Sequence, residues 1–527
     1  MDMKRLGKYM ILSVTAAALL AGCTGKFEDY NTNPYGPTDG DMKGDNVETG
    51  VLIQSMTPAI VQGGQNDSQM IDQMIGLEYG GHAAMIQPWQ GTNFQTYNPA
   101  IGWVGAPFTT IMPQIYTNYF KIKEKTEGKG VVYSWAQIIR VAASIKVSDC
   151  YGPIPYSKVT GSEYTVAYDS MEELYIAMFK DLTAAIETLK GAVAANADFS
   201  SLKDFDYIYQ GDFNKWVKYA NSLKLRMAIR IANAPMTKGD ANLAQKMAEE
   251  AVSDATGVMT TVGDAAYSTF SDGMNPFYRA EYTWNNGGEF RASANITSYM
   301  EGYNDPRKTI YFDKDSRSGY RGVRNGIDMN QSKRATCLNY SRIRLQEGEP
   351  LLVMSASEVC FLRAEGALRG WNMGGQTAQQ YYEQGIRVSM EEKKATLGNY
   401  LSSTAHPADY ADYEQSYKYS AMSTVSPKWD TAAGFEENLE RIIIQKWIAT
   451  YPSGWETWAD IRRTGYPKFF PIVDNKSNSA VSSSRGMRRL PFPESEKNTN
   501  TANVEAAVAM LEGSDTAATD LWWAKKD

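Results

Sequence analysis

The fold of this chain is decided by long amphipathic stretches, the clearest of which is MEELYIAMFKDLTAAIETLK, residues 171–190. Its apolar residues recur every three or four positions and therefore share one face of a helix; they are Leu174, Met178, Leu182, Ile186 and Leu189. The same periodicity predicts helices at 134–147, 215–231 and 355–369, and two further helices are expected at 377–395 and 436–450. We therefore predict a mainly α fold.

Long segments rich in aromatic residues and glycine separate these helices. They cover residues 76–110, 148–168, 263–295, 312–350 and 452–500. Loops of such length are usually functional, because a structureless excursion is otherwise uncommon in a compact chain. No strict helical repeat is visible. We expect a single helical domain over residues 46–527, with large loop excursions.

Composition excludes several classes of function. The chain has 527 residues and a formal net charge of −7, which argues against nucleic acid as a partner. Its two histidines, His82 and His406, are too few for a histidine-rich metal site. Motifs for phosphate loops, dinucleotide binding, zinc proteases and serine hydrolases are missing, and Asp328-Met329-Asn330 lacks the rest of a calcium loop. We expect no metal, no cofactor and no catalytic residues.

The N-terminus is predicted to be a lipoprotein signal. Basic residues precede the apolar segment Met10–Leu20, which is too short to span a bilayer. Leu20-Ala21-Gly22-Cys23 resembles a bacterial lipobox, in which the cysteine is lipidated after cleavage. We expect residues 1–22 to be a signal peptide, Cys23 the lipid anchor and residues 23–45 a flexible tether. No stretch of about 20 apolar residues follows, so no membrane-spanning helix is expected.

Three more cysteines, Cys150, Cys337 and Cys360, remain in the body of the chain. An odd number in an exported chain is a poor disulfide framework, so we predict free thiols. Cys360 lies in an apolar run and is expected to be a small buried side chain.

Aromatic residues are the most informative feature for function. Two loops, QPWQGTNFQTY at 87–97 and FYRAEYTWNN at 277–286, combine aromatic rings with amide and charged side chains. A flat ring can stack on the face of a sugar while polar groups bind the hydroxyls at its edge. Packing beneath the loops is the competing interpretation. The predicted stacking residues are Trp89, Tyr282 and Trp284, and the predicted edge donors are Asn93 and Arg291. Trp447 instead continues a helical apolar face, and His82 is expected to be structural.

A series of short motifs occurs along the chain in one order. They are FEDYNTNP (27–34), VSDCYGPIPY (147–156), NDPR (304–307), MSASEV (354–359), QKW (445–447), ETWADIRRTG (456–465), RRLPFPE (488–494) and LWW (521–523). In this order they resemble the SusD/RagB family, the nutrient-binding lipoproteins of the Bacteroidetes outer membrane. Ser148 and Pro153 depart from the family pattern. The motifs themselves contain turns and extended proline segments, so they are expected to be scaffold and not site.

The resemblance implies a right-handed α-superhelix of TPR-like helix pairs with a loop-rich side that binds ligand. It implies a non-enzymatic protein, anchored by lipid in the outer membrane and exposed on the cell surface, whose partner is a SusC-like TonB-dependent barrel. An oligosaccharide is the expected ligand, and a peptide is the alternative within the family. Two alternatives from other classes are a surface glycoside hydrolase, which needs a pair of carboxylates in a cleft, and a TPR-like protein-interaction scaffold, which needs no aromatic cluster.

Overall fold

Helices carry most of the fold in the computed structural model, which describes residues 46–89, 91–284 and 287–525. The predicted signal peptide, the lipid anchor Cys23 and the tether at 23–45 lie outside the described residues, as does the side chain of Trp284. From Thr49 onward the chain forms one compact unit.

The helices have the following bounds. The α-helices are α4 (Val47–Met56), α5 (Gln65–Asp67), α6 (Ile101–Val104), α7 (Ala106–Lys125), α8 (Gly130–Tyr151), α9 (Met171–Ala194), α10 (Phe213–Arg230), α11 (Leu243–Ser253), α12 (Pro276–Tyr278), α13 (Ala294–Gly302), α14 (Lys308–Tyr311), α15 (Gln331–Cys337), α16 (Ala356–Leu368), α17 (Ala378–Glu392), α18 (Phe435–Ala449), α19 (Gly454–Thr464), α20 (Glu494–Thr499) and α21 (Thr501–Ala509). Short 3-10 turns are η2 (Thr57–Ala59), η4 (Ser200–Phe205), η5 (Val262–Asp264) and η7 (Tyr400–Ser402), and π-helical segments are η3 (Ser68–Leu77) and η6 (Arg279–Trp284).

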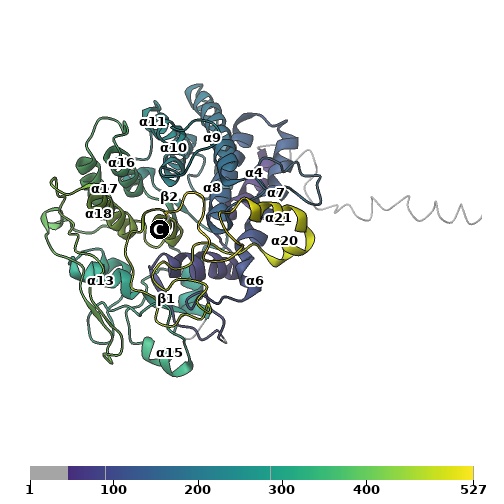
Figure 1. Cartoon of the computed structure of the whole chain (residues 1–527). Coiled ribbons are helices and arrows are strands. Elements are labelled where there is room, and N and C mark those ends of the chain that lie inside the picture. Colours follow the sequence, from purple (N-terminus) through teal and green to yellow (C-terminus); the bar gives the residue numbers. More distant parts are fainter. Residues whose placement is uncertain (1–45, 90, 285–286, 526–527) are drawn as a thin grey trace, which may run out of the picture. The chain divides into compact units, whose positions relative to one another are not determined.

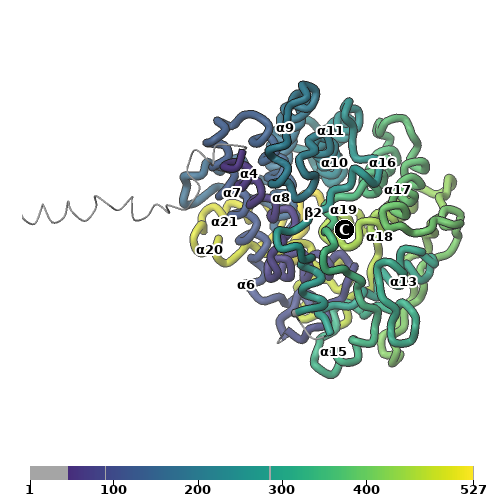
Figure 2. Tube along the Cα trace, turned by 180° about the vertical axis from the view of Figure 1, so that it is seen from behind, coloured from purple at the N-terminus to yellow at the C-terminus, as the bar shows by residue number. Residues whose placement is uncertain are grey.

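The long helices pack in succession. Helix α8 contacts α7 and α9, α10 contacts α9 and α11, and α16 contacts α17 and α18. Contacts between α10 and α16 join the two groups. Figures 1 and 2 show the same succession, from α9 through α10 and α16 to α17 and α18, with α13 and α15 toward the bottom of both views. These helix pairs, with a loop-rich side, confirm the predicted fold class.

The predicted helices all exist because each buries the face that its periodicity marks. Helix α9 begins with a capping box in which Ser170 accepts from the backbone of Glu173, and its predicted apolar residues are buried. Ser355 caps α16 by accepting from the Glu358 N–H. Gly370 follows that helix with φ 81°, a left-handed conformation that favours glycine.

The predicted loops contain more structure than expected. Helix α19 lies inside the segment 452–500 and α15 inside 312–350. Helix α19 lacks the usual apolar periodicity because some of its buried residues are charged and form ion pairs, among them Asp460 and Arg463. Trp447 and Trp458 are buried as predicted, Trp455 is partly buried, and His82 is fully buried.

Strands are short and form two-stranded pairs. The strands are β1 (Ala83–Met85), β2 (Ala266–Ser268), β3 (Phe290–Ala292), β4 (Leu351–Met354), β5 (Tyr410–Ala411) and β6 (Lys418–Tyr419). They form the antiparallel pairs β1–β3, β2–β4 and β5–β6. In the first pair Ala84 lies opposite Arg291.

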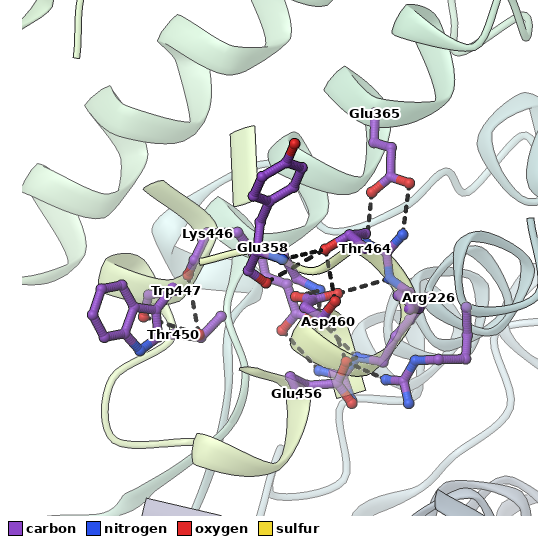
Figure 3. A network of polar contacts seen from close by, with 12 residues as sticks. Arg226, Glu358, Glu365, Lys446, Trp447, Thr450, Glu456, Asp460 and Thr464 are labelled. Atoms are coloured by element: carbon purple, nitrogen blue, oxygen red, sulfur yellow. Dashed lines mark hydrogen bonds and ion pairs between the residues drawn. The ribbon is translucent and has the colours of Figure 1, made fainter. Parts of the chain in front are cut away.

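Buried charges tie α16, α18 and α19 together (Figure 3). Glu365 on α16 accepts two hydrogen bonds from Arg463 on α19, at 2.7 and 2.6 Å. Asp460, also on α19, pairs with Arg463 at 2.9 Å and with Lys446 of α18 at 2.9 Å. All of these side chains are buried. Because a buried charge without its partner is costly, this network fixes the position of α19.

None of the helices among the described residues combines the length and apolar character needed to span a membrane. Cys150, Cys337 and Cys360 are buried free thiols, as predicted.

Candidate ligand-binding site

The two aromatic loops that the sequence singles out emerge from the same pair of strands. The loop at 87–97 follows β1, and the segment 277–289 leads into β3. The backbone N–H of Ile86 also donates to the carbonyl of Glu289 at 2.8 Å. Loops almost 200 positions apart in sequence thus start from one short sheet.

Trp89 is only partly buried, and it packs edge-on against Trp103 with ring centroids 5.7 Å apart. Its Nε1–H is buried and donates to no partner among the described residues. The indole is therefore partly held by protein packing. Whether the ring stacks on a ligand remains a prediction.

Asn93, a predicted edge donor, is 2% exposed. Its backbone carbonyl accepts from the N–H of Asn98 at 3.0 Å and shapes the loop, while no described residue donates to its Oδ1. This amide lies beneath the loop and does not present itself at the surface.

Tyr282 lies half-buried in a stack of planar groups. Its ring is parallel to that of Tyr278 with centroids 4.7 Å apart, and the guanidinium of Arg342 lies 3.6 Å from its ring centroid. The Tyr282 hydroxyl donates to the carbonyl of Ile343 at 2.8 Å. Both the ring and the hydroxyl already have protein partners.

Arg291 differs most from its predicted role as an exposed donor. It is 4% exposed and pairs with the fully buried Glu281 at 3.1 Å. Its Nη atoms also donate to the carbonyls of Phe290 and Gly287, at 2.6 and 2.9 Å. Burial lowers the pKa of Arg291, although Glu281 opposes this shift. The side chain serves to fasten the second loop to β3.

A cavity of about 440 Å³ lies beside the first aromatic loop. This volume falls within the usual range for small-molecule sites. The cavity is bounded by the segment after η3, by Tyr97 of the first loop, by α19 and by the chain between residues 465 and 488. Its aromatic lining consists of Tyr79, Tyr97, Trp458, Phe469 and Phe470. None of the five residues predicted as ligand contacts is among the described lining.

Tyr97 is held in an unusual backbone conformation. Its φ is 60°, in the left-handed region that side chains other than glycine seldom adopt. Such residues persist where the surroundings enforce them and cluster at ligand sites. Here the backbone N–H of Lys476 donates to the Thr96 carbonyl at 2.8 Å. The Tyr97 ring lies edge-on to the Tyr79 ring, with centroids 6.2 Å apart. The loop thereby delivers one aromatic ring to the cavity wall.

One carboxyl group, that of Glu78, is found among the described residues lining the cavity. It accepts hydrogen bonds from Asn325 Nδ2 at 2.9 Å and from the Met85 N–H at 2.8 Å. Burial raises the pKa of Glu78 to about 7, although these two hydrogen bonds oppose the shift. Near neutral pH this carboxyl is therefore only partly ionised.

A second hollow of about 250 Å³ is bounded by residues 323–340 and 410–417. Tyr340, Tyr410 and Tyr417 line it together with Arg324. Arg324 Nη2 donates to the Pro471 carbonyl at 2.6 Å and so connects this hollow to the segment that also bounds the larger cavity. The loop-rich side thus carries two aromatic hollows. The described residues contain no group of three or more His, Cys, Asp or Glu side chains that could hold a metal ion.

Sequence reasoning missed most of the cavity lining. Trp458 carries the periodicity of a core residue, and it is indeed 2% exposed while also lining the cavity. A usable signal is the stretch Tyr466-Pro467-Lys468-Phe469-Phe470, in which two aromatic rings and a cation follow a helix-ending glycine. Tyr97 belongs to a loop that was singled out, but nothing in its sequence separates it from Trp89.

Comparisons with known proteins agree with the geometry. A family model described as "Susd and RagB outer membrane lipoprotein" matches residues 29–524. A SusD homologue from Bacteroides uniformis is 39% identical with a TM-score of 0.85, covering 91% of this chain and 99% of that chain. A SusD-like protein from Bacteroides thetaiotaomicron is 38% identical with a TM-score of 0.85, at the same coverage of 91% and 99%. A chitin-binding SusD homologue from Flavobacterium johnsoniae is 34% identical with a TM-score of 0.84, covering 91% and 99%. Among curated proteins, none matches the chain.

Proposed function

Because the chain belongs to the SusD-like family of outer-membrane lipoproteins, we propose that it is a cell-surface lipoprotein that captures a nutrient oligosaccharide and delivers it to a TonB-dependent outer-membrane transporter. The single observation that carries the binding role is the 440 Å³ cavity with aromatic walls beside the first loop. The chitin-binding relative supports a glycan as the class of ligand.

The cavity has the chemistry that a sugar requires. The C–H faces of a pyranose pack on flat rings, and Tyr97 and Phe469, which are both only partly buried, provide such rings at the cavity wall. Polar groups at the edge bind hydroxyls, and here the lining includes the amide of Asn325 and the hydroxyls of Ser483 and Ser484. The proposed contacts are therefore led by Tyr97, with the exposed parts of Trp89 and Tyr282 as outer contacts.

A binding role fits the cavity better than hydrolysis. Glycoside hydrolysis uses two carboxyl groups on either side of the bond to be cleaved. The described lining provides only Glu78, which is buried and hydrogen-bonded to the scaffold. We therefore assign no catalytic residue.

Calorimetry with a panel of oligosaccharides tests this proposal, using the mature protein with Cys23→Ala to keep it in solution. Tyr97→Ala should weaken binding by about 1–3 kcal/mol, the usual cost of losing an aromatic anchor, or about five- to 150-fold. Tyr164→Ala is the matched control, because that ring is 94% exposed and does not line the cavity. Equal affinities for the two variants, with both folded, would mean that the cavity is not the glycan site.

Delivery to a transporter has its own test. The lipoprotein, extracted from outer membranes in mild detergent, should co-purify with a TonB-dependent barrel. If it is recovered alone under conditions that keep other outer-membrane complexes together, the partner assignment is wrong, while glycan binding is unaffected.

A further inference from the structure

Cations dominate the polar lining of the 440 Å³ cavity. Its described lining includes the five side chains Arg462, Lys468, Arg485, Arg488 and Lys525. The only carboxyl group among the described lining residues is that of Glu78. A concave site with one sign of charge attracts ligands of the opposite sign, because its low-dielectric walls focus the field.

The carboxylates that balance these cations lie behind them. Lys468 pairs with Glu440 at 3.0 Å, and Arg485 pairs with Asp520 at 3.1 Å. Neither Glu440 nor Asp520 is among the described residues that line the cavity. The side chains of Lys468 and Arg485 are 45% and 30% exposed. Both cations can therefore reach a ligand while remaining anchored from behind.

Arg462 adds a buried positive charge at the cavity. Its side chain is fully buried, and in the described structure it makes hydrogen bonds to carbonyl oxygens only: those of Trp458, Asp149 and Arg488. No described residue accepts a hydrogen bond from its Nη2. The guanidinium stacks 3.7 Å from the centre of the Trp458 ring, which compensates its charge only in part. The buried side chain is closed to a ligand, but its charge adds to the positive potential at the cavity.

We propose that this cavity takes a carboxylated sugar, such as a uronic acid residue of an acidic oligosaccharide, with its ring against Tyr97 and its carboxylate between Lys468 and Arg485. This inference rests on the proposed glycan-binding function and narrows its ligand class. A neutral sugar would use the aromatic wall but would not interact with the exposed charges of Lys468 and Arg485. An acidic peptide would use the cations but offers no sugar ring for the aromatic wall at Tyr97.

The test compares acidic glycans with neutral forms of the same chain. Oligosaccharides of galacturonan, alginate and hyaluronan are each paired with the form in which the carboxylates have been reduced to primary alcohols. Acidic hexapeptides form a third arm. Calorimetry on the full mature chain with Cys23→Ala should find an acidic glycan that binds at least about tenfold more tightly than its reduced form, the value of one charge-assisted hydrogen bond.

Two variants locate the carboxylate. Lys468→Gln and Arg485→Gln should each weaken the acidic glycan by about tenfold and leave the reduced form unchanged. Lys476→Gln is the control, because Lys476 also pairs with a carboxylate, that of Asp328 at 2.6 Å, but does not line the cavity. Thermal melts confirm that each variant is folded.

The outcomes separate this proposal from the proposed function. Equal affinity for acidic and reduced glycans, or binding of neutral glycans alone, overturns the acidic ligand and leaves glycan binding intact. Unchanged acidic affinity in both cavity variants also overturns it. Binding of the acidic peptides without any glycan, or no binding in any arm, overturns the glycan function and the acidic ligand together.

Discussion

Replacing Glu365 with glutamine should be among the most damaging conservative changes in this protein. The carboxylate is 1% exposed and accepts from Arg463 at 2.7 and 2.6 Å and from Arg369 at 3.0 and 2.8 Å. Breaking a buried ion pair by removing one partner costs about 3–5 kcal/mol, because the remaining charge stays buried. Arg463 keeps its pair with Asp460 at 2.9 Å, so the lower end, about 3 kcal/mol, is expected.

Urea unfolding followed by tryptophan fluorescence measures this loss as a shift in midpoint at unchanged slope. Glu494→Gln is the matched control: Glu494 pairs with Lys497 at 3.1 Å, but its side chain is 51% exposed, so its loss should cost less than about 1 kcal/mol. A loss for Glu365→Gln that is no greater than for Glu494→Gln would refute the assignment of the network as a structural clamp.

The pH dependence gives a second check on Glu365. Burial alone would raise its pKa, but Arg463 and Arg369 together lower it to about 2. A carboxyl whose pKa is lower in the folded state contributes stability that is present above its unfolded value of 4.5. The stability difference between the wild type and Glu365→Gln should therefore shrink as the pH falls below 4.5 toward 2.

Three further predictions follow from buried or terminal groups. Burial lowers the pKa of His82 from 6.5 to about 3. Between these pH values the folded state binds fewer protons than the unfolded state, so the free energy of unfolding should fall by about 1.4 kcal/mol per pH unit below 6.5. Between pH 7 and pH 5 the urea midpoint should therefore decrease less for His82→Gln than for the wild type, and His406→Gln is the control because His406 is exposed. Thiol titration of a Cys23→Ala protein should find three thiols after denaturation without reductant and almost none in the native state, because Cys150, Cys337 and Cys360 are buried; a single thiol after denaturation would reveal a disulfide. Cys23→Ala should fold but no longer partition with membranes, and retention after a high-salt wash would argue against lipidation as the anchor, provided that the barrel partner is absent.

The helices could be predicted because burial of one face leaves a periodic mark in the sequence. The helix at 171–190 and its observed counterpart α9 begin at the same residue, where Ser170 and Glu173 form the cap. Helix α19 was missed because its buried positions include Asp460 and Arg463, whose charges are satisfied by partners distant in sequence. Apolar periodicity therefore does not detect a helix whose buried residues are charged and paired.

The ligand site was predictable only in part. The sequence singles out the two aromatic loops but not the short sheet from which both start. Arg291 was predicted to donate to a ligand, whereas in the structure it is 4% exposed and pairs with Glu281. Its partner Glu281 lies ten positions earlier, in a π-helical turn that the sequence pattern does not predict. The cavity itself could not be foreseen, because Tyr79, Tyr97 and Trp458 meet only in three dimensions.

Helix α19 has two faces with different tasks, and this has a consequence for kinetics. One face carries Asp460 and Arg463 into the ion-pair network, while the other carries Trp458 and Arg462 to the cavity. A ligand cannot draw this wall inward without opening buried ion pairs, so the wall is preorganised before the ligand arrives. Little conformational entropy is then lost on binding, and association need not wait for a rearrangement. Capture should accordingly be rapid, and differences in affinity between related glycans should reside mainly in how fast each one leaves.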